Sequence, residues 1–405
     1  MNNIGPTRVM YFDHTAMLGG GEIALLNLIS NLDREVVRPL VVLCSDGPLA
    51  EALRPIAEVK VLELSDEIRR AKKDGLGFAS FLRVKQLLQV AHYINKLRRL
   101  IRQNEIDIVH TNSLKSDIIG GLAARLAFTP VVWHLRDRIE KDYLPNSVVR
   151  VFRLLAKILP TIVIAISQGV LKTLDLKSER AVVVHDGTNL PPLFEEPVNK
   201  QYLRVGLIGR ICPWKGQDIF LKAAAIVKTT LPDIRFQIVG SAMFDEQEYE
   251  RRIRALCTSL RLDDVVTFAG FRPDIDAVLH NLDVVVHAST LGEPFGQVIV
   301  EGMAAAKPVI ATNGGGVPEI VVNGETGLIV PMSDPSAMAD AICQLLKNPE
   351  LRLEMGRKGR ERVRSHFTLN RTAQGVQAVY AKIQAAHSSH KTTSALPSHS
   401  LFRKA

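Results

Sequence analysis

Two acidic residues, Glu293 and Glu301, are separated by seven residues in the stretch GEPFGQVIVEG. The loop through Phe295 and Gly296 precedes a helix predicted over 297–306, and the free backbone N–H groups at its start would favour an anion. Glu301 lies about one turn inside that helix, where its carboxylate can accept hydrogen bonds from a vicinal diol but cannot help to bind phosphate. The pattern therefore indicates a ligand with both hydroxyl groups and phosphate, such as a nucleotide sugar.

Two basic residues, Arg210 and Lys215, follow a strand predicted over 203–208. Glycines flank them on both sides. An arginine offers a bidentate fork and a lysine a point charge, so the pair could clamp a diphosphate. Two cations in a loop are commonly surface charges, but the acids at Glu293 and Glu301 favour the functional interpretation.

The first half of the chain opens with a strand predicted over 8–13, a loop containing Gly19 and Gly20, and a helix to about residue 32. A strand, a glycine loop and a helix form the layout of an anion-binding turn. The loop does not follow the dinucleotide pattern G-x-G-x-x-G. An ordinary tight turn is the alternative interpretation.

Two histidines end predicted strands, His110 at 107–110 and His134 at 130–134. Ligands of open parallel sheets meet the carboxyl ends of the strands, so both positions are candidates for a site. A structural role is the alternative for each histidine. His134 is the stronger candidate because Arg136 follows it closely.

These motifs together resemble the signature of retaining glycosyltransferases with the GT-B fold, in the large family numbered four. The resemblance covers about residues 8–385, and it is strongest after residue 203 and weakest over 33–104. It implies an α/β protein of two Rossmann-like domains, each a doubly wound parallel sheet, that face an interdomain cleft. It also implies transfer of a sugar from a nucleotide-diphosphate sugar with retention at the anomeric carbon.

The resemblance assigns roles to individual residues. His134 would lie beside the reactive sugar, Glu293 would hold the sugar hydroxyls and Glu301 the ribose. The implied catalytic residues are His134, Arg210, Lys215 and Glu293. The implied donor-binding residues are Gly19, Gly20, Phe271, Arg272, Phe295, Gly296 and Glu301. Core packing is the alternative for Phe271, and Glu319 is expected to cap the loop after a triple glycine at 314–316.

The leaving phosphate would take the proton of the acceptor hydroxyl, as the resemblance implies. Neither a metal nor another cofactor is expected, because cations fill that role and no Asp-x-Asp motif precedes a plausible site. Two alternatives share the donor: a nucleotide-sugar epimerase of the GT-B fold, and a protein that binds nucleotide sugars without turnover.

The alternation of strands and helices restarts after a proline-rich stretch, which predicts two domains. Residues 1–190 would form the acceptor-side domain, 191–200 the linker, and 201–366 the donor-side domain. A helix over 367–385 would cross back to the first domain. Residues 386–405 are rich in Ser, Thr, His and Lys, which predicts a disordered tail.

Most of the net charge of +9 lies between Arg69 and Arg102, where only Asp74 opposes ten basic residues. An amphipathic helix predicted over 78–103 carries many of them. A solvated surface is the plain interpretation of this helix, and contact with an anionic membrane is the second. Binding of nucleic acid is disfavoured, because Tyr93 is the one aromatic residue between the basic residues Arg83 and Arg102.

The four cysteines are scattered, which suits a reducing compartment. No apolar run reaches the roughly 18 residues that span a bilayer, and no signal peptide is expected. We therefore expect a cytoplasmic protein, with a peripheral position at the inner face of the cell membrane as the alternative. Its acceptor would be a saccharide or a lipid-linked molecule.

Overall fold

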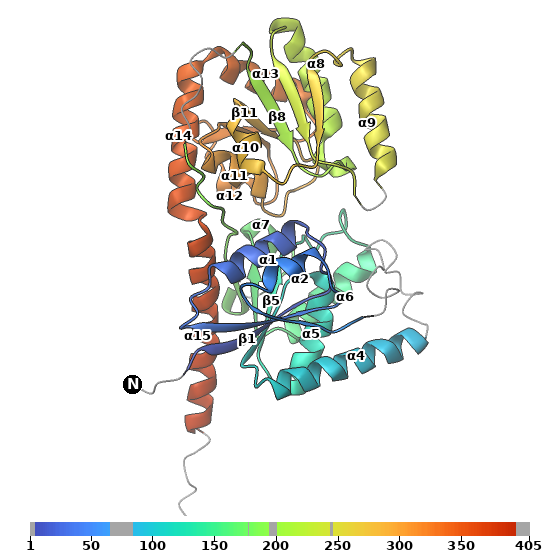
Figure 1. Cartoon of the computed structure of the whole chain (residues 1–405), viewed down its shortest axis with the longest axis vertical. Helices are drawn as coiled ribbons and strands as arrows, with labels where there is room; N and C mark the ends of the chain where they lie inside the picture. Colours follow the sequence, from blue (N-terminus) through green and yellow to red (C-terminus); the bar gives the residue numbers. More distant parts are fainter. Residues whose placement is uncertain (1–4, 65–83, 177, 194–200, 244–245, 394–405) are drawn as a thin grey trace, which may run out of the picture.

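The computed structural model describes residues 5–64, 84–176, 178–193, 201–243 and 246–393, with side chains omitted at 84–86, 178 and 388–393. Within these residues the chain forms two lobes, each built on one parallel sheet (Figure 1). The first sheet has the strand order β3-β2-β1-β4-β5-β6-β7, and the second has β10-β9-β8-β11-β12-β13. The prediction of two doubly wound parallel sheets is confirmed.

The central strands of the first sheet are near-continuous apolar runs, such as IVIA in β6, because parallel strands inside a sheet are buried on both faces. The sheet consists of β1 (Thr7–Asp13), β2 (Val37–Leu43), β3 (Glu58–Val61), β4 (Ile108–Thr111), β5 (Val131–Leu135), β6 (Ile162–Ala165) and β7 (Ala181–Val183).

Helices cover both faces of this sheet. The face with α1, α2 and α15 buries Leu25, Leu49 and Tyr380. The other face buries Leu97 of α4 and Phe152 of α6. The helices of this lobe are α1 (Gly20–Ser30), α2 (Pro48–Leu53), α4 (Val84–Gln103), α5 (Leu114–Ala127), α6 (Asn146–Ile158) and α7 (Gln168–Lys172), with a 3-10 turn at Ser178–Arg180.

The second sheet repeats the pattern. Its strands are β8 (Arg204–Ile208), β9 (Arg235–Val239), β10 (Val266–Gly270), β11 (Val284–His287), β12 (Val309–Thr312) and β13 (Gly327–Val330). Its helices are α8 (Gln217–Thr230), α9 (Gln247–Ser259), α10 (Ile275–His280), α11 (Gln297–Ala304), α12 (Val317–Ile320), α13 (Pro335–Lys347) and α14 (Pro349–His366), with a 3-10 turn at Pro213–Lys215.

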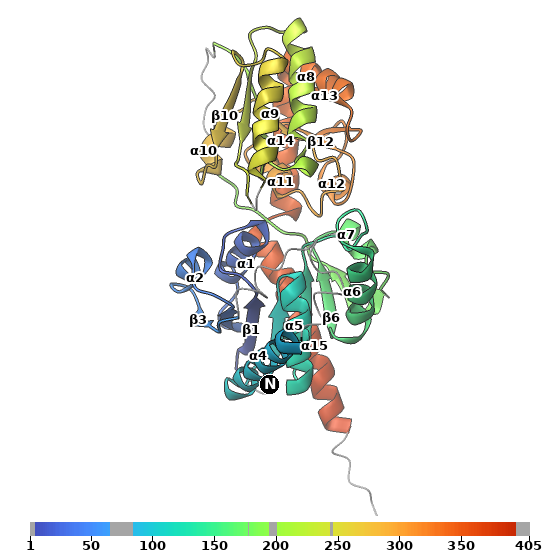
Figure 2. The ribbon, with the colours of Figure 1, turned by 90° about the vertical axis from the view of Figure 1, so that its right-hand side faces the viewer.

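The last helix, α15 (Leu369–Thr393), returns to the first lobe. Figures 1 and 2 show α14 beside the second lobe and α15 along the first. The Tyr380 hydroxyl lies 2.9 Å from that of Tyr11 on β1, and the Gln384 side chain donates to Thr7 at 2.6 Å. The C-terminal helix is therefore part of the first lobe's core.

Three expectations need correction or fall outside the description. The predicted disordered tail begins too early, because α15 continues to Thr393; its residues 385–393 contain no proline or glycine that would end a helix. Three short helices, α2, α10 and α12, were not predicted, since four to six residues show no helical period. Residues 194–200 of the predicted linker and 78–83 of the basic helix lie outside the described residues.

The return of the chain at α15 depends on Gly187. A Cβ on Gly187 would overlap the backbone of Thr368, and Thr188 N–H donates to the Phe367 carbonyl at 2.9 Å. We predict that Gly187→Ala lowers the free energy of unfolding by about 1–3 kcal/mol through overpacking, measured by urea denaturation. Gly5→Ala is the control, because a Cβ there meets nothing within 4 Å; equal stability of the two variants would contradict this account.

Candidate active site between the lobes

Loops at the carboxyl ends of strands in the two lobes contact each other. The Arg138 guanidinium, after β5, donates to the Gly292 carbonyl at 3.1 Å, and the Ser167 hydroxyl, after β6, donates to the Pro294 carbonyl at 2.6 Å. Both acceptors lie in the loop after β11. The loop that carries Glu293 and Phe295 therefore contacts the first lobe after β5 and β6.

Glu319 forms a second contact between the lobes. Its carboxylate accepts the backbone N–H groups of Gln168 and Gly169 at 2.8 and 2.9 Å, and lies 3.0 Å from His185 Nε2. Burial alone would raise the pKa of Glu319, but the hydrogen bonds from these three donors lower it. The expectation that Glu319 caps its own loop is wrong, because its side chain reaches the N-terminus of α7.

The Glu293 carboxylate has three side-chain hydrogen-bond partners. Its Oε2 lies 2.8 Å from Lys215 Nζ, 2.9 Å from His287 Nε2 and 2.8 Å from the Ser289 hydroxyl. Burial alone would raise the pKa of Glu293, but the charge of Lys215 and the hydrogen bond of His287 hold it well below its usual range. Glu293 is therefore a carboxylate that cannot readily accept a proton.

The triple glycine holds the loop that carries Glu293. Gly316 N–H donates to the Glu293 carbonyl at 2.8 Å, and a Cβ on Gly315 would overlap that same carbonyl. Gly315 also has a φ of 60°, a conformation that glycine adopts without strain. Glycine at this position is thus required for the close approach of the two loops.

Arg210 and Lys215 lie in the loop after β8, as predicted. Arg210 Nε lies 3.5 Å from Glu246 Oε2, while Lys215 pairs with Glu293 and lies 4.2 Å from the ring centroid of Trp214. The Trp214 carbonyl accepts Thr290 N–H at 2.8 Å, which joins this loop to the one after β11. The structure therefore brings one predicted cation into contact with one predicted acid.

Glu301 lies in the first turns of α11, near the N-cap Gly296. Gln297 donates to it at 3.3 Å. Burial raises the pKa of Glu301 to about 7, the Gln297 hydrogen bond opposes the rise and the charge of Asp276 adds to it. This acid is thus in a different electrostatic state from Glu293.

Phe295, Phe271 and Arg272 have different surroundings. Phe295 is 3% exposed and stacks on His185 with ring centroids 5.8 Å apart, so its side chain packs in the core. Its place in the donor site stays a prediction. Phe271 is 71% exposed, which removes the core alternative. Arg272 pairs with Asp274 at the surface, with Nε 2.8 Å from Oδ1.

The glycine loop of the first lobe already has an acid at its amides. Gly19 N–H donates to the Glu22 carboxylate at 3.1 Å, at the start of α1. Burial and the nearby charge of Asp13 raise the pKa of Glu22 to about 7. The N–H of Gly19 is therefore already bonded, whereas a Cβ on Gly20 would meet nothing within 4 Å, and the donor-binding role of both glycines stays a prediction.

His134 is fully buried, and its contact with the sugar stays a prediction. Its Nδ1 lies 3.1 Å from His110 Nε2, and burial and the charge of Arg136 lower its pKa well below the ordinary value. The residues of β5 are all buried. Arg136 and Arg138 follow the strand, and their side chains are 7% and 12% exposed.

Five residues of the site were not predicted as such. His287 ends β11 and Ser289 follows it closely, and their position at a strand end was the available signal. Arg136 donates to Asn112 at 2.8 Å and pairs with Asp186 at 2.5 Å, a contact between residues 50 positions apart that no local pattern indicates.

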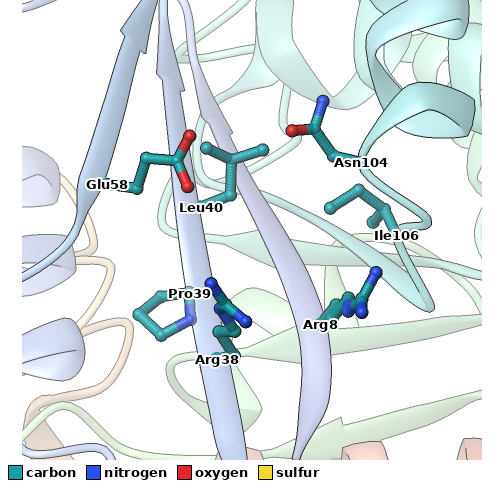
Figure 3. Close-up of a pocket in the computed structure, with 7 residues that line it drawn as sticks. All are labelled: Arg8, Arg38, Pro39, Leu40, Glu58, Asn104 and Ile106. Atoms are coloured by element: carbon teal, nitrogen blue, oxygen red, sulfur yellow. The ribbon is translucent and has the colours of Figure 1, made fainter.

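A cavity of about 230 Å³ lies at the opposite, amino ends of β1 and β2 (Figure 3). Its lining mixes both charges, since Arg8 and Arg38 lie there together with Glu58. Among the described residues, no group of three or more His, Cys, Asp or Glu side chains could hold a metal ion. The helices described here are all too short or too polar to cross a bilayer.

The comparisons with known proteins follow the division into lobes. Residues 18–190 match the family "Glycosyltransferase Family 4", and residues 193–362 match "Glycosyl transferases group 1". The chain superimposes on the crystal structure of Anabaena HepE in complex with UDP and glucose with a TM-score of 0.79. The two sequences are 26% identical, and the match covers 93% of this chain and 99% of the HepE chain. The chain is a glycosyltransferase of the GT-B type.

This glycosyltransferase is also similar to curated proteins. It is 27% identical to an uncharacterized glycosyltransferase of Methanocaldococcus jannaschii, over 74% of this chain and 83% of the relative. It is 29% identical to the phosphatidyl-myo-inositol mannosyltransferase of Mycobacterium leprae, over 67% of this chain and 72% of the relative. For several other relatives the match spans about half of their length or less.

The Lys215–Glu293 pair gives the first prediction from the site. Lys215→Met leaves a buried, uncompensated carboxylate, so we expect the free energy of unfolding to fall by about 3 kcal/mol. The double variant Lys215→Met, Glu293→Gln should cost less than Lys215→Met alone. Urea unfolding measures both. Lys222→Met is the control, because its pair with Asp218 is partly exposed and should contribute at most about 0.5 kcal/mol; a double variant no more stable than Lys215→Met would contradict the assigned pair.

Glu301 gives a pH prediction. Its pKa rises from 4.5 to about 7 on folding, so the folded state binds the proton more tightly, and the free energy of unfolding falls as pH rises through that interval. Glu301→Gln removes this loss, and we expect it to gain about 2 kcal/mol on the wild type between pH 4.5 and 8. Urea unfolding at several pH values tests this, with exposed Glu350→Gln as the control; parallel curves for wild type and Glu301→Gln would refute it.

Proposed function

We propose that this glycosyltransferase moves a sugar from a nucleotide-diphosphate sugar to an acceptor hydroxyl, with retention at the anomeric carbon. The proposal depends chiefly on the 2.8 Å contact between Lys215 Nζ and Glu293 Oε2, on the lobe where Glu301 lies in the first turns of α11. A cation suited to phosphate and acids suited to hydroxyls thus lie on one lobe. HepE, with which this chain shares its fold, was solved with UDP and with UDP-glucose.

Arg210 and Lys215 would stabilise the leaving diphosphate. As the bond between the anomeric carbon and the phosphate oxygen breaks, negative charge grows on the diphosphate while the sugar becomes positive. Fixed cations in a partly buried site stabilise such charge effectively. Since these cations and the amides near Gly20 and Gly296 meet that need, we expect neither a metal nor another cofactor.

Retention would follow from attack on the same face of the sugar that the diphosphate leaves. The acceptor oxygen bonds to the anomeric carbon, and its proton passes to the leaving phosphate oxygen. Glu293 is poorly suited to take this proton, because Lys215 and His287 hold its pKa well below the usual range despite its burial. It would instead accept hydrogen bonds from sugar hydroxyls, while Glu301 binds the ribose.

The acceptor would be a saccharide or a lipid-linked molecule, in the synthesis of cell-envelope polysaccharide or glycolipid. Helix α4 supports contact with an anionic membrane surface: Leu87 and Leu88 are 47% and 65% exposed, on a helix that also exposes Lys96 and Arg99. One relative is named for a phosphatidyl-myo-inositol mannosyltransferase. Such a contact would place the protein at the inner face of the cell membrane.

A panel of nucleotide sugars, screened by thermal stabilisation, would identify the donor. With UDP or the nucleotide so found, we predict that Glu301→Ala weakens binding of the free nucleotide about tenfold, the loss of one charge-assisted hydrogen bond. Glu293→Ala should leave nucleotide affinity within about twofold but lower the rate of donor turnover by about 10²-fold. Titration calorimetry and nucleotide release measure the two effects.

Glu350→Ala, an exposed glutamate of the same lobe, is the control and should change neither quantity. Wild-type affinity and turnover in both site variants would defeat the assignment. Sugar isomerisation with donor alone would indicate the epimerase, and nucleotide binding without turnover would indicate a binding protein.

A further inference from the structure

Four buried side chains form a continuous hydrogen-bonded chain across the first lobe. The Tyr380 hydroxyl of α15 lies 2.9 Å from the Tyr11 hydroxyl of β1 and 2.7 Å from His110 Nδ1 of β4. His110 Nε2 then lies 3.1 Å from His134 Nδ1 of β5. The C-terminal helix is thereby connected to the histidine that the sequence associates with the sugar.

The direction of the hydrogen bonds can be derived. The Tyr380 hydroxyl donates a hydrogen bond to the Tyr11 oxygen. The Tyr380 oxygen therefore accepts a hydrogen bond from His110 Nδ1–H. Burial and the charge of Arg136 lower the pKa of His110 to about 3, and that of His134 well below its ordinary value, so both rings are neutral. A neutral ring protonated at Nδ1 has a lone pair at Nε2. His110 Nε2 therefore accepts from His134 Nδ1–H.

The chain ends at His134 Nε2, which must then be an acceptor. Among the described residues no group donates to this buried atom, and the buried Nη2 of Arg136 has no acceptor. A hydroxyl group that donates a hydrogen bond to His134 Nε2 would satisfy this atom.

We propose that Tyr380 is a positioning residue that fixes His134, through His110, in the Nδ1–H tautomer, so that Nε2 accepts a hydrogen bond from a hydroxyl of the donor sugar or of the acceptor. The part about the tautomer concerns the free protein alone. The part about the ligand rests on the proposed function, and it requires the ligand to reach His134 when it binds. The C-terminal helix would in this way contribute to the site of the first lobe.

Nitrogen-15 NMR of histidine-labelled, full-length protein tests the tautomer, because protonated and bare ring nitrogens have distinct shifts. We expect His110 and His134 to be neutral and protonated at Nδ1 in the wild type. Tyr380→Phe removes the acceptor of His110 Nδ1–H, and Tyr11→Phe frees the Tyr380 proton to turn toward His110. Each variant should therefore add a second tautomer at both histidines, and Tyr11→Phe serves if Tyr380→Phe does not fold.

Tyr93→Phe is the matched control. It removes a buried hydroxyl of the same lobe, bonded to Cys44 and to the Leu62 carbonyl, without touching the chain of hydrogen bonds. It should leave both tautomers as in the wild type. An Nε2–H tautomer at His134 in the wild type, or unchanged tautomers in both Tyr380→Phe and Tyr11→Phe, would overturn the proposal.

Binding measurements separate this proposal from the proposed function. Tyr380→Phe should weaken UDP-glucose, or the donor found in the screen, about tenfold while leaving UDP, which has no sugar, within twofold. Equal weakening of both ligands, or of neither, would contradict the role toward the sugar. Should the wild type bind no nucleotide sugar at all, the proposed function fails while the tautomer result stands by itself.

Discussion

The buried pair between Lys215 and Glu293 is the interaction on which the site depends. It joins the loop after β8 to the loop after β11, with His287 and Ser289 completing the hydrogen bonds of the acid. An unpaired charge at this depth would be costly, so each residue requires the other in place. Gly315 and Gly316 then hold the backbone of the same loop. Fold stability and site geometry are thus set by the same contacts.

The two lobes treat their buried polar groups differently. In the second lobe a cation and an acid neutralise each other, and Glu293 stays charged. In the first lobe burial lowers the pKa of His110 and of His134, so both rings are neutral. A hydrogen bond, not an ionic interaction, connects the two rings. The first lobe also holds a buried ion pair, Arg136–Asp186, beside these neutral histidines. Its site therefore combines paired charge with oriented neutral dipoles.

The sequence predicted the two parallel sheets and most of the larger helices, because apolar runs and helical periods are local signals. The spacing of glycines, cations and acids also predicted that Lys215 and Glu293 belong to the same site. The sequence did not predict the burial of His134 and Phe295, since burial depends on what covers a strand end or a loop from elsewhere in the chain. Tyr380 reaches His110 across 270 positions of sequence, and Glu319 reaches Gln168 across 151. No local pattern carries such information.

The contact of Glu319 with the first lobe has a consequence for motion. One carboxylate satisfies two backbone amides and an imidazole of the opposite lobe. A small hinge rotation that breaks one of these bonds weakens the geometry of the other two, because all three converge on the same two oxygen atoms. Separation of the lobes at this point should then be cooperative, so that all three hydrogen bonds break together and not one after another.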